Sequence, residues 1–92
     1  MPDHLFRSIE PPAVATVILY GKPACPLCDE AEVLVQQVAK SKRLQIQKID
    51  VTTDLDLYRR YGLEIPVLEL PGGRELHWPF SANDILAGLG ST

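Results

Sequence analysis

The chain has 92 residues, of which 46% are hydrophobic and 23% are charged, and its formal net charge is −3. This length suits one domain with a modest core and excludes two cores side by side. Because the charge is nearly balanced and no long like-charged run occurs, the composition argues against binding to phosphate backbones or anionic membrane surfaces. We therefore expect one monomeric globular domain with no nucleic-acid or membrane partner.

The first 13 residues mix charged side chains with three prolines and show no sustained hydrophobic period. Such a segment is typical of a poorly ordered or loosely docked arm. We predict an arm at residues 1–13 and a folded domain at residues 14–92. The domain opens with an apolar, β-branched run at residues 14–20, which is too short to cross a bilayer and predicts a central strand covered on both faces.

A helix is expected after this strand and a short loop. Its apolar residues recur at helical spacing, at Leu27, Ala31, Leu34, Val35 and Val38. This period predicts a helix from about residue 26 to residue 40. Pro26 suits the first turn of that helix, where the missing N–H of proline has no intrahelical partner to lose.

The middle of the chain predicts a strand followed by a short helix. Residues 44–51 alternate apolar and polar side chains, which indicates a strand with one buried face at the edge of a sheet. Thr53 or Asp54 can then cap a short helix that ends at Gly62. That helix carries three apolar residues on one side, namely Leu55, Tyr58 and Tyr61.

The last third of the chain predicts a hairpin and a final helix. Residues 67–70 and 75–78 read as strands because they flank the turn sequence Pro71-Gly72-Gly73-Arg74. Ser81 followed by Asp84 resembles a capping box, which opens a helix. The inward residues of that helix are expected to be Ile85, Leu86 and Leu89.

The predicted order of elements is βαβαββα, which belongs to the α/β class. A right-handed crossover pairs the first two strands in parallel, and the hairpin supplies antiparallel strands. We therefore predict a mixed four-stranded sheet flanked by helices.

The sequence Cys25-Pro26-Leu27-Cys28 lies where the first strand passes into the first helix, a position in which a CxxC pair indicates redox chemistry. The positive end of a helix stabilises a thiolate and can lower a cysteine pKa from about 8.5 into roughly the 3.5–7.5 range. We expect Cys25 to be the nucleophile. Cys28 lies one turn into the helix, so it is expected to be shielded and to resolve a mixed disulfide.

The segment Lys22-Pro23-Ala24-Cys25-Pro26-Leu27-Cys28 resembles that of glutaredoxins in the thioredoxin superfamily, in which a lysine precedes a C-P-x-C dithiol by three residues. The chain resembles a group of small glutaredoxin-like proteins still more closely, over about residues 14–89. The resemblance implies a thioredoxin-like fold of glutaredoxin type. It also implies a thiol–disulfide oxidoreductase that reduces protein disulfides or glutathione mixed disulfides and needs a reductant system as partner. Glutathione is then a co-substrate, and no cofactor is bound.

Ile65-Pro66-Val67 resembles the superfamily segment whose proline is cis and whose backbone pairs with a bound substrate. On this resemblance, Lys22 helps to hold the thiolate and a substrate carboxylate, and Pro66 shapes a groove beside Cys25. The implied substrate-binding residues are Lys22, Pro26, Leu27, Ile65, Pro66 and Val67. Glutaredoxins also carry a Gly-Gly and an acidic residue before the last helix, whereas the only Gly-Gly here, Gly72-Gly73, falls in the predicted hairpin turn.

Other functions remain open from the residues alone. The fold is compatible with a non-catalytic module that binds a partner near Pro66 and Trp78, although Trp78 and Phe80 are better explained as packing residues. Cys25 and Cys28 are also compatible with metal or iron–sulfur carriage, but a tetrahedral zinc site needs four ligands and only His4 and His77 remain as strong candidates. Two closely spaced cysteines do not form the framework of a secreted disulfide-rich domain, so we predict a cytoplasmic location.

Overall fold

The computed structural model describes residues 15–90. The predicted arm, together with residues 14, 91 and 92 of the predicted domain, lies outside the described residues. The elements follow the predicted order, with one added 3-10 turn: β1 (Ala15–Gly21), α2 (Pro26–Lys42), β2 (Leu44–Asp50), η1 (Val51–Thr53), α3 (Leu55–Tyr61), β3 (Val67–Glu69), β4 (Glu75–His77) and α4 (Ala82–Leu89).

The four strands form one mixed sheet in the order β2-β1-β3-β4. β1 runs parallel to β2, with Ala15 opposite Leu44 and Gly21 opposite Asp50. β3 is antiparallel to β1 and also to β4. The central position of β1 and the edge position of β2 confirm the predictions made from their hydrophobic patterns.

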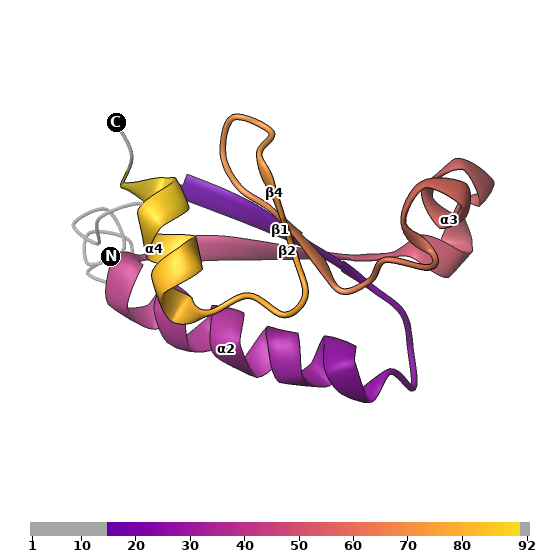
Figure 1. Cartoon of the computed structure of the whole chain (residues 1–92), viewed down its shortest axis with the longest axis horizontal. Helices are drawn as coiled ribbons and strands as arrows, with labels where there is room; N and C mark the ends of the chain where they lie inside the picture. Colours follow the sequence, from indigo (N-terminus) through magenta and orange to yellow (C-terminus); the bar gives the residue numbers. More distant parts are fainter. Residues whose placement is uncertain (1–14, 91–92) are drawn as a thin grey trace, which may run out of the picture.

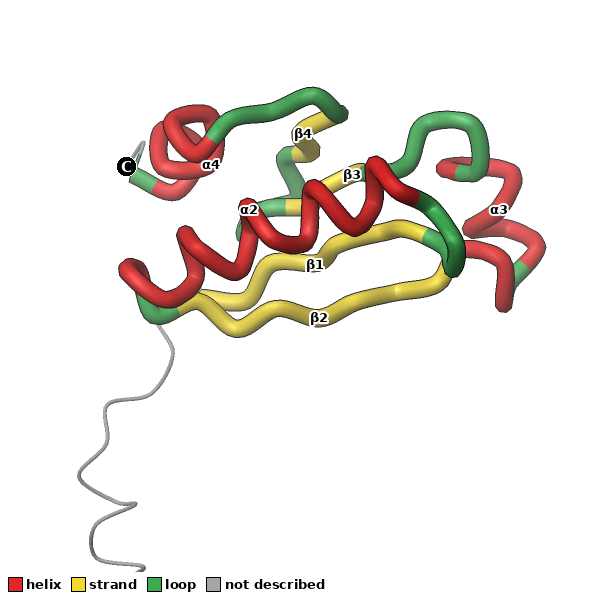
Figure 2. The backbone as a smooth tube through the Cα atoms, turned by 90° about the horizontal axis from the view of Figure 1, so that it is seen from below, coloured by secondary structure: helices red, strands yellow, loops and turns green. Residues whose placement is uncertain are grey.

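Helices α2 and α4 lie on the same side of the sheet, whereas α3 lies at one end of the molecule (Figures 1 and 2). The main core fills the space between the sheet and helices α2 and α4. Its buried members are Val17, Leu19, Ala31, Val35, Val38, Leu68, Leu70, Phe80 and Ile85. Phe80 is buried, and Trp78 packs against it edge to face with ring centroids 5.1 Å apart. Both residues therefore contribute to packing, as expected.

Within residues 15–90, the buried residues on the second face of the sheet lie near α3. There Tyr20, Val51, Tyr61 and Val67 form a smaller buried cluster. Farther along β1, Ile18 is half-buried and Thr16 is exposed. The prediction that β1 is covered on both faces along its length was therefore wrong. The cause is that α2 and α4 share one face, so only the short helix α3 is left for the other.

Element ends show where local signals were sufficient. Asp54, rather than Thr53, caps α3 by accepting a hydrogen bond from the Leu57 N–H at 3.1 Å. The capping box of α4 is confirmed, because the Asp84 N–H donates to Ser81 Oγ at 3.1 Å and the Ser81 N–H donates to Asp84 Oδ2 at 2.9 Å. Helix α2 extends to Lys42, two residues beyond the predicted end.

The turn between β3 and β4 depends on its two glycines. Gly72 and Gly73 have φ angles of 93° and 94°, in a region that residues with a Cβ rarely adopt. The Leu70 N–H donates to the Arg74 carbonyl at 2.7 Å and closes the loop.

Over residues 15–90, no helix is both long enough and apolar enough to cross a bilayer.

Candidate active site

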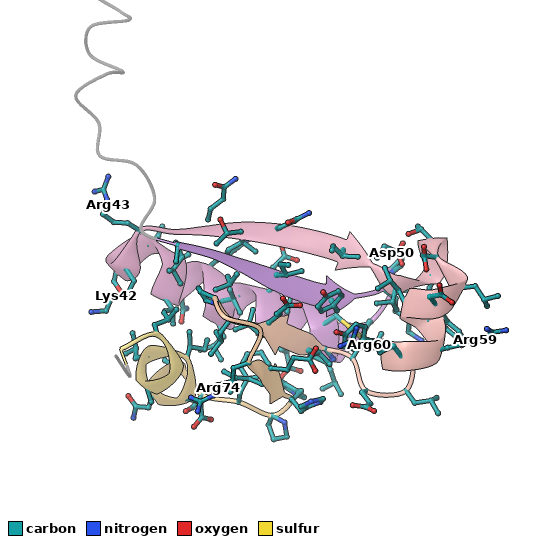
Figure 3. The ribbon with its side chains drawn as sticks, turned by 90° about the horizontal axis from the view of Figure 1, so that it is seen from above. Lys42, Arg43, Asp50, Arg59, Arg60 and Arg74 are labelled. Carbon is teal, nitrogen blue, oxygen red and sulfur yellow. A yellow bond between two sulfur atoms is a disulfide. The ribbon has the colours of Figure 1, made fainter. Side chains whose placement is uncertain are left out.

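The two cysteines lie at the end of the sheet where β1 and β2 both finish. Gly21, the last residue of β1, pairs with Asp50, the last residue of β2. Figure 3 places Asp50 at the same end of the molecule as Arg59 and Arg60, with the disulfide drawn as a yellow bond there, whereas Lys42 and Arg43 lie at the opposite end. The dithiol loop therefore shares one end of the fold with helix α3.

Cys25 is the N-cap of α2, and its sulfur accepts a hydrogen bond from the Cys28 N–H at 3.2 Å. The residue before it, Ala24, has a φ of 55°, a left-handed conformation that costs of the order of 1–3 kcal/mol for a residue with a Cβ. This turn directs the chain from β1 into the helix. It places the Cys25 sulfur against the first free N–H groups of a 17-residue helix, where a developing negative charge is stabilised.

Cys28 is joined to Cys25 by a disulfide and is buried, with 6% of its surface exposed, whereas Cys25 is half-buried. A Cβ placed on Gly21 would lie 3.3 Å from both the Cβ and the sulfur of Cys28. The missing side chain of Gly21 therefore allows β1 to approach Cys28 closely. Sequence reasoning missed this role of Gly21, since the glycine predicted only the end of a strand.

Pro26 and Leu27, between the cysteines, are both exposed, and 48% of the surface of Leu27 is accessible to solvent. Pro26 is the first residue of α2, as predicted. An exposed apolar side chain directly beside a disulfide is available to contact whatever approaches the sulfur atoms.

The segment Ile65-Pro66-Val67 reaches the same end of the sheet from the β3 side. Val67 pairs with Tyr20, so Pro66 and Ile65 lie beyond the point where β1 passes into the dithiol loop. The Ile65–Pro66 peptide bond is cis. Pro66 and Val67 are buried, and half-buried Ile65 packs on the cluster that contains Tyr20. Val67 therefore has no side-chain surface to offer a substrate, and contact would fall to the backbone and to Ile65.

Lys22 lies instead on the β2 side, where a cleft of about 290 Å³ opens between β1, α2 and β2. It is lined by Leu19, Gly21, Lys22, Pro23, Cys28, Asp29, Glu32, Lys48, Ile49 and Asp50. The structure thus brings Lys22 and Cys28 together in one cleft, and Ile65, Pro66 and Val67 are not among its lining residues. The predicted substrate-binding residues divide between two sides of the dithiol.

Sequence reasoning also missed Glu32 and Lys48, which form an ion pair at 2.8 Å in this cleft. Glu32 follows Cys28 by four residues and so lies on the same face of α2. That spacing was a usable signal. No local signal marks Lys48, because it lies on β2, far from Glu32 in the sequence.

A cluster of aromatic and charged side chains lies on the α3 side of the sheet. The Tyr20 hydroxyl donates to Glu69 at 2.8 Å, and the Tyr61 hydroxyl donates to Glu75 at 2.5 Å. Burial raises the pKa of both tyrosines above its ordinary value, and the carboxylate that each hydroxyl contacts raises it further. Arg60 Nη2 lies 3.9 Å from Glu75. The Tyr20 bond joins β1 to β3 within the sheet, and the Tyr61 bond holds α3 to β4.

Metal ligands do not gather anywhere in residues 15–90, where no group of three or more His, Cys, Asp or Glu residues is arranged to hold an ion. His77, a predicted candidate ligand, lies 3.2 Å from Glu64 and 3.8 Å from Glu75. The other candidate, His4, lies outside the described residues.

The family model described as Glutaredoxin-like domain (DUF836) matches residues 16–90 of the chain. Its match includes the dithiol loop, the Ile65-Pro66-Val67 segment and the final helix.

Solved structures show the same architecture. The X-ray structure of XcR50, a structural genomics target protein from X. campestris, is 36% identical and matches with a TM-score of 0.71, covering 83% of this chain and 97% of that one. The solution structure of Ne2328 from Nitrosomonas europaea is 26% identical, with a TM-score of 0.70 and coverage of 89% and 95%. Thioredoxin-2, a component of the malaria parasite protein secretion machinery, is 21% identical, with a TM-score of 0.62 and coverage of 84% and 82%. This last likeness shows the thioredoxin-like α/β fold alone.

Proposed function

This chain belongs to the glutaredoxin-like domain family, and we propose that it is a thiol–disulfide oxidoreductase that works through Cys25 and Cys28. Its substrates are protein disulfides or glutathione mixed disulfides. We further propose that it acts in the cytoplasm as a monomer, with no bound cofactor and with glutathione as a co-substrate.

The observation that carries this proposal is the position of Cys25 as the N-cap of α2. Its sulfur accepts a hydrogen bond from the Cys28 N–H and the residue is half-buried, while Cys28 is buried one turn later and is bonded to it. A thiolate at this position is stabilised and accessible, which are the two requirements for nucleophilic attack. The buried partner is protected from outside reagents and is already placed to attack Cys25.

The reaction transfers two electrons from the Cys25/Cys28 dithiol to the substrate disulfide in two thiol–disulfide exchange steps. The Cys25 thiolate attacks one sulfur of the substrate disulfide, forms a mixed disulfide and releases the first substrate thiolate, which takes a proton. Cys28 then loses its proton and attacks the Cys25 sulfur, which releases the second substrate thiol. The protein is left with the Cys25–Cys28 disulfide that the structure contains.

We place the substrate chain on the β3 side of the dithiol, against Leu27 and the backbone before β3. Leu27 is exposed, and Ile65 precedes a proline and therefore lies outside the regular pairing of β3. The Ile65 N–H already donates to the Tyr61 carbonyl at 3.0 Å and Pro66 has no N–H, so we propose that an extended substrate segment there donates to the Ile65 carbonyl, as in other strand-like recognition. Lys22 is proposed to balance the charge of a thiolate or a substrate carboxylate.

Insulin reduction and a glutathione-coupled assay with a mixed-disulfide substrate test this proposal. We expect the wild type to be active in at least one assay and Cys25→Ser to be inactive in both. Ser41→Ala, at the far end of α2, serves as a control that keeps both cysteines. Wild-type protein with no turnover in either assay, or a Cys25→Ser variant with full activity, would contradict the proposal.

A further inference from the structure

The side chain of Tyr61, the last residue of α3, contacts two strands of the sheet. Its ring stacks on Tyr20 of β1 with the centroids 4.2 Å apart, and its hydroxyl donates to Glu75 on β4. The guanidinium carbon of Arg60 lies over the same ring, 5.1 Å from its centroid. Only 2% of the surface of Tyr61 is exposed. This residue therefore fixes the end of α3 against the sheet.

The backbone of Tyr61 holds the segment that precedes β3. Its carbonyl accepts a hydrogen bond from the Ile65 N–H at 3.0 Å. The pairing of β3 with β1 begins at Val67, opposite Tyr20, and Pro66 has no N–H to contribute. Ile65 is therefore held by the strand on one side and by Tyr61 on the other.

This arrangement leaves the carbonyl of Ile65 for a substrate. Among the loop, turn and cap hydrogen bonds of residues 15–90, none is accepted by the Ile65 carbonyl. The N–H and the C=O of one residue are connected through only two soft dihedral angles. Anchoring the Ile65 N–H on Tyr61 therefore limits the directions in which the Ile65 carbonyl can point.

Helix α3 needs tertiary contacts to keep Tyr61 in place. It has seven residues, and helices shorter than about 12–15 residues are marginal in water without packing partners. Stacked aromatic rings supply packing with a preferred geometry. Because Tyr20 directly precedes Gly21 at the end of β1, the stack links the strand that leads to Cys25 with the helix that leads to Ile65.

We propose that Tyr61 is a positioning residue for substrate binding, and that its stack on Tyr20 holds the Ile65 carbonyl where an extended polypeptide disulfide donates to it. The inference rests on the proposed function and assigns its substrate class. A disulfide with a peptide backbone beside its sulfur gains this hydrogen bond, whereas a small disulfide without amide groups does not. Tyr61 touches none of the reacting sulfur atoms, so it acts on substrate binding and leaves the exchange step unchanged.

The experiment compares two substrates of the reduced wild-type chain in single turnovers. One is a short peptide whose cysteine is disulfide-bonded to thionitrobenzoate, and the other is the mixed disulfide of thionitrobenzoate and 2-mercaptoethanol. Cys25 attacks the sulfur of the peptide or of mercaptoethanol and expels the thionitrobenzoate thiolate, the better leaving group, whose absorbance gives the rate. The peptide yields a half-saturation concentration and a limiting rate, and the small substrate yields a second-order rate constant.

Tyr61→Leu removes the stacked ring and should raise the half-saturation concentration for the peptide by about fivefold, the effect of one hydrogen bond. The limiting rate and the rate constant for the small substrate should stay close to the wild-type values. Tyr58→Leu is the matched control, because it removes a half-exposed ring from the same helix, and it should change neither substrate. Equal losses with both substrates, or no loss with the peptide, would overturn the proposal.

Tyr61→Phe separates the ring from its hydroxyl. It keeps the ring that stacks on Tyr20 and loses the bond to Glu75. We expect its half-saturation concentration for the peptide to stay near the wild-type value. A Phe variant as weak as the Leu variant would refute the role of the stack. If Tyr61→Leu does not fold, Tyr20→Leu removes the other ring and should weaken binding of the peptide alone.

Ester analogues of the peptide test the hydrogen bond itself. Each analogue replaces one amide next to the cysteine by an ester, which removes an N–H and keeps the chain length. With the wild type, one analogue should raise the half-saturation concentration by about fivefold. With Tyr61→Leu, the same replacement should have little further effect, because two changes that remove one interaction are not additive.

Two results with these analogues would overturn the proposal. If no ester weakens binding to the wild type, the Ile65 carbonyl accepts no bond from the substrate. If one ester weakens binding equally to the wild type and to Tyr61→Leu, Tyr61 does not act through that carbonyl. The proposed function fails in a different way, namely if the wild type reacts with both substrates no faster than Cys25→Ser does.

Discussion

The rings of Tyr20 and Tyr61 are stacked, with their centroids 4.2 Å apart and their planes inclined by 21°. Tyr20 is the residue before Gly21 at the end of β1, and Tyr61 is the last residue of α3. The stack therefore joins the strand that leads into the dithiol loop to the helix that leads into the Ile65-Pro66-Val67 segment. Each hydroxyl is also anchored to a carboxylate, on β3 for Tyr20 and on β4 for Tyr61.

This arrangement predicts a loss of stability in alkaline solution. Burial raises the pKa of Tyr20 and of Tyr61 in the folded state, so both phenols stay protonated where the unfolded chain, with a tyrosine pKa near 10, has already lost its protons. The stabilisation is therefore complete below about pH 10 and decreases as the pH rises through the folded-state values. Denaturant unfolding measured from pH 8 to pH 11 should show the free energy of unfolding falling above about pH 10.

A double variant separates this effect from general alkaline unfolding. Tyr20→Phe combined with Tyr61→Phe should lower stability at pH 8, because Glu69 and Glu75 lose their donors, but should flatten the alkaline decrease. Tyr58→Phe, on the exposed side of α3, is the matched control and should keep the wild-type profile. If the free energy of unfolding of the double variant decreased above about pH 10 as steeply as that of the wild type, the decrease would not come from Tyr20 and Tyr61.

A pair of leucines tests where the stabilising core lies. Leu68 is fully buried between the sheet and α2, whereas Leu63 is 99% exposed. Leu68→Ala removes packed atoms and leaves a cavity, so it should cost about 2–5 kcal/mol in the free energy of unfolding. Leu63→Ala should change it by less than about 0.5 kcal/mol. Similar losses for both variants, measured by urea unfolding of the oxidised protein, would be incompatible with this core.

The parts of the fold that the sequence predicted correctly depend on neighbours close in the chain. The Ser81–Asp84 capping box, the Gly72-Gly73 turn and the dithiol at a helix N-terminus each involve residues within about one turn, so their side-chain types report directly on local geometry. The end of α2 was missed because its last residues, Ser41 and Lys42, face solvent and carry no apolar period.

The parts that were not predictable join residues far apart in the chain. Tyr20 and its acceptor Glu69 are separated by 49 residues, and Glu32 meets Lys48 only because β2 lies beside α2. Tyr61 was predicted to lie on an apolar side of its helix, but nothing in the pattern indicated that its ring stacks on β1. The side chains of the cleft come from β1, α2 and β2, so only the assembled fold reveals it.

The two cysteines should differ in reactivity once the disulfide is reduced. Cys25 combines exposure with the N–H groups at the start of α2, and Cys28 is buried. Below pH 7 we therefore expect iodoacetamide to alkylate Cys25 about tenfold faster than Cys28, because the thiolate is the reacting form. Peptide mapping after timed quenching measures both rates in the same sample. Equal rates, or faster labelling of Cys28, would reverse the assigned roles.

The division of labour between the cysteines predicts a trapped intermediate. In Cys28→Ser, Cys25 keeps its place as the N-cap of α2 and should still attack a disulfide, but no second thiol is present to release the adduct. Mixed with oxidised glutathione or with a disulfide-bonded protein, this variant should accumulate a mixed disulfide on Cys25, visible as a mass increase under non-reducing conditions and lost on reduction. The wild type should show the adduct only transiently and end as the Cys25–Cys28 disulfide.

Cys25→Ser is the matched control for this experiment: its only thiol, Cys28, is buried and should form the adduct much more slowly. A Cys28→Ser variant that forms no adduct with either substrate would show that Cys25 is not a nucleophile and would leave the pair without a redox role.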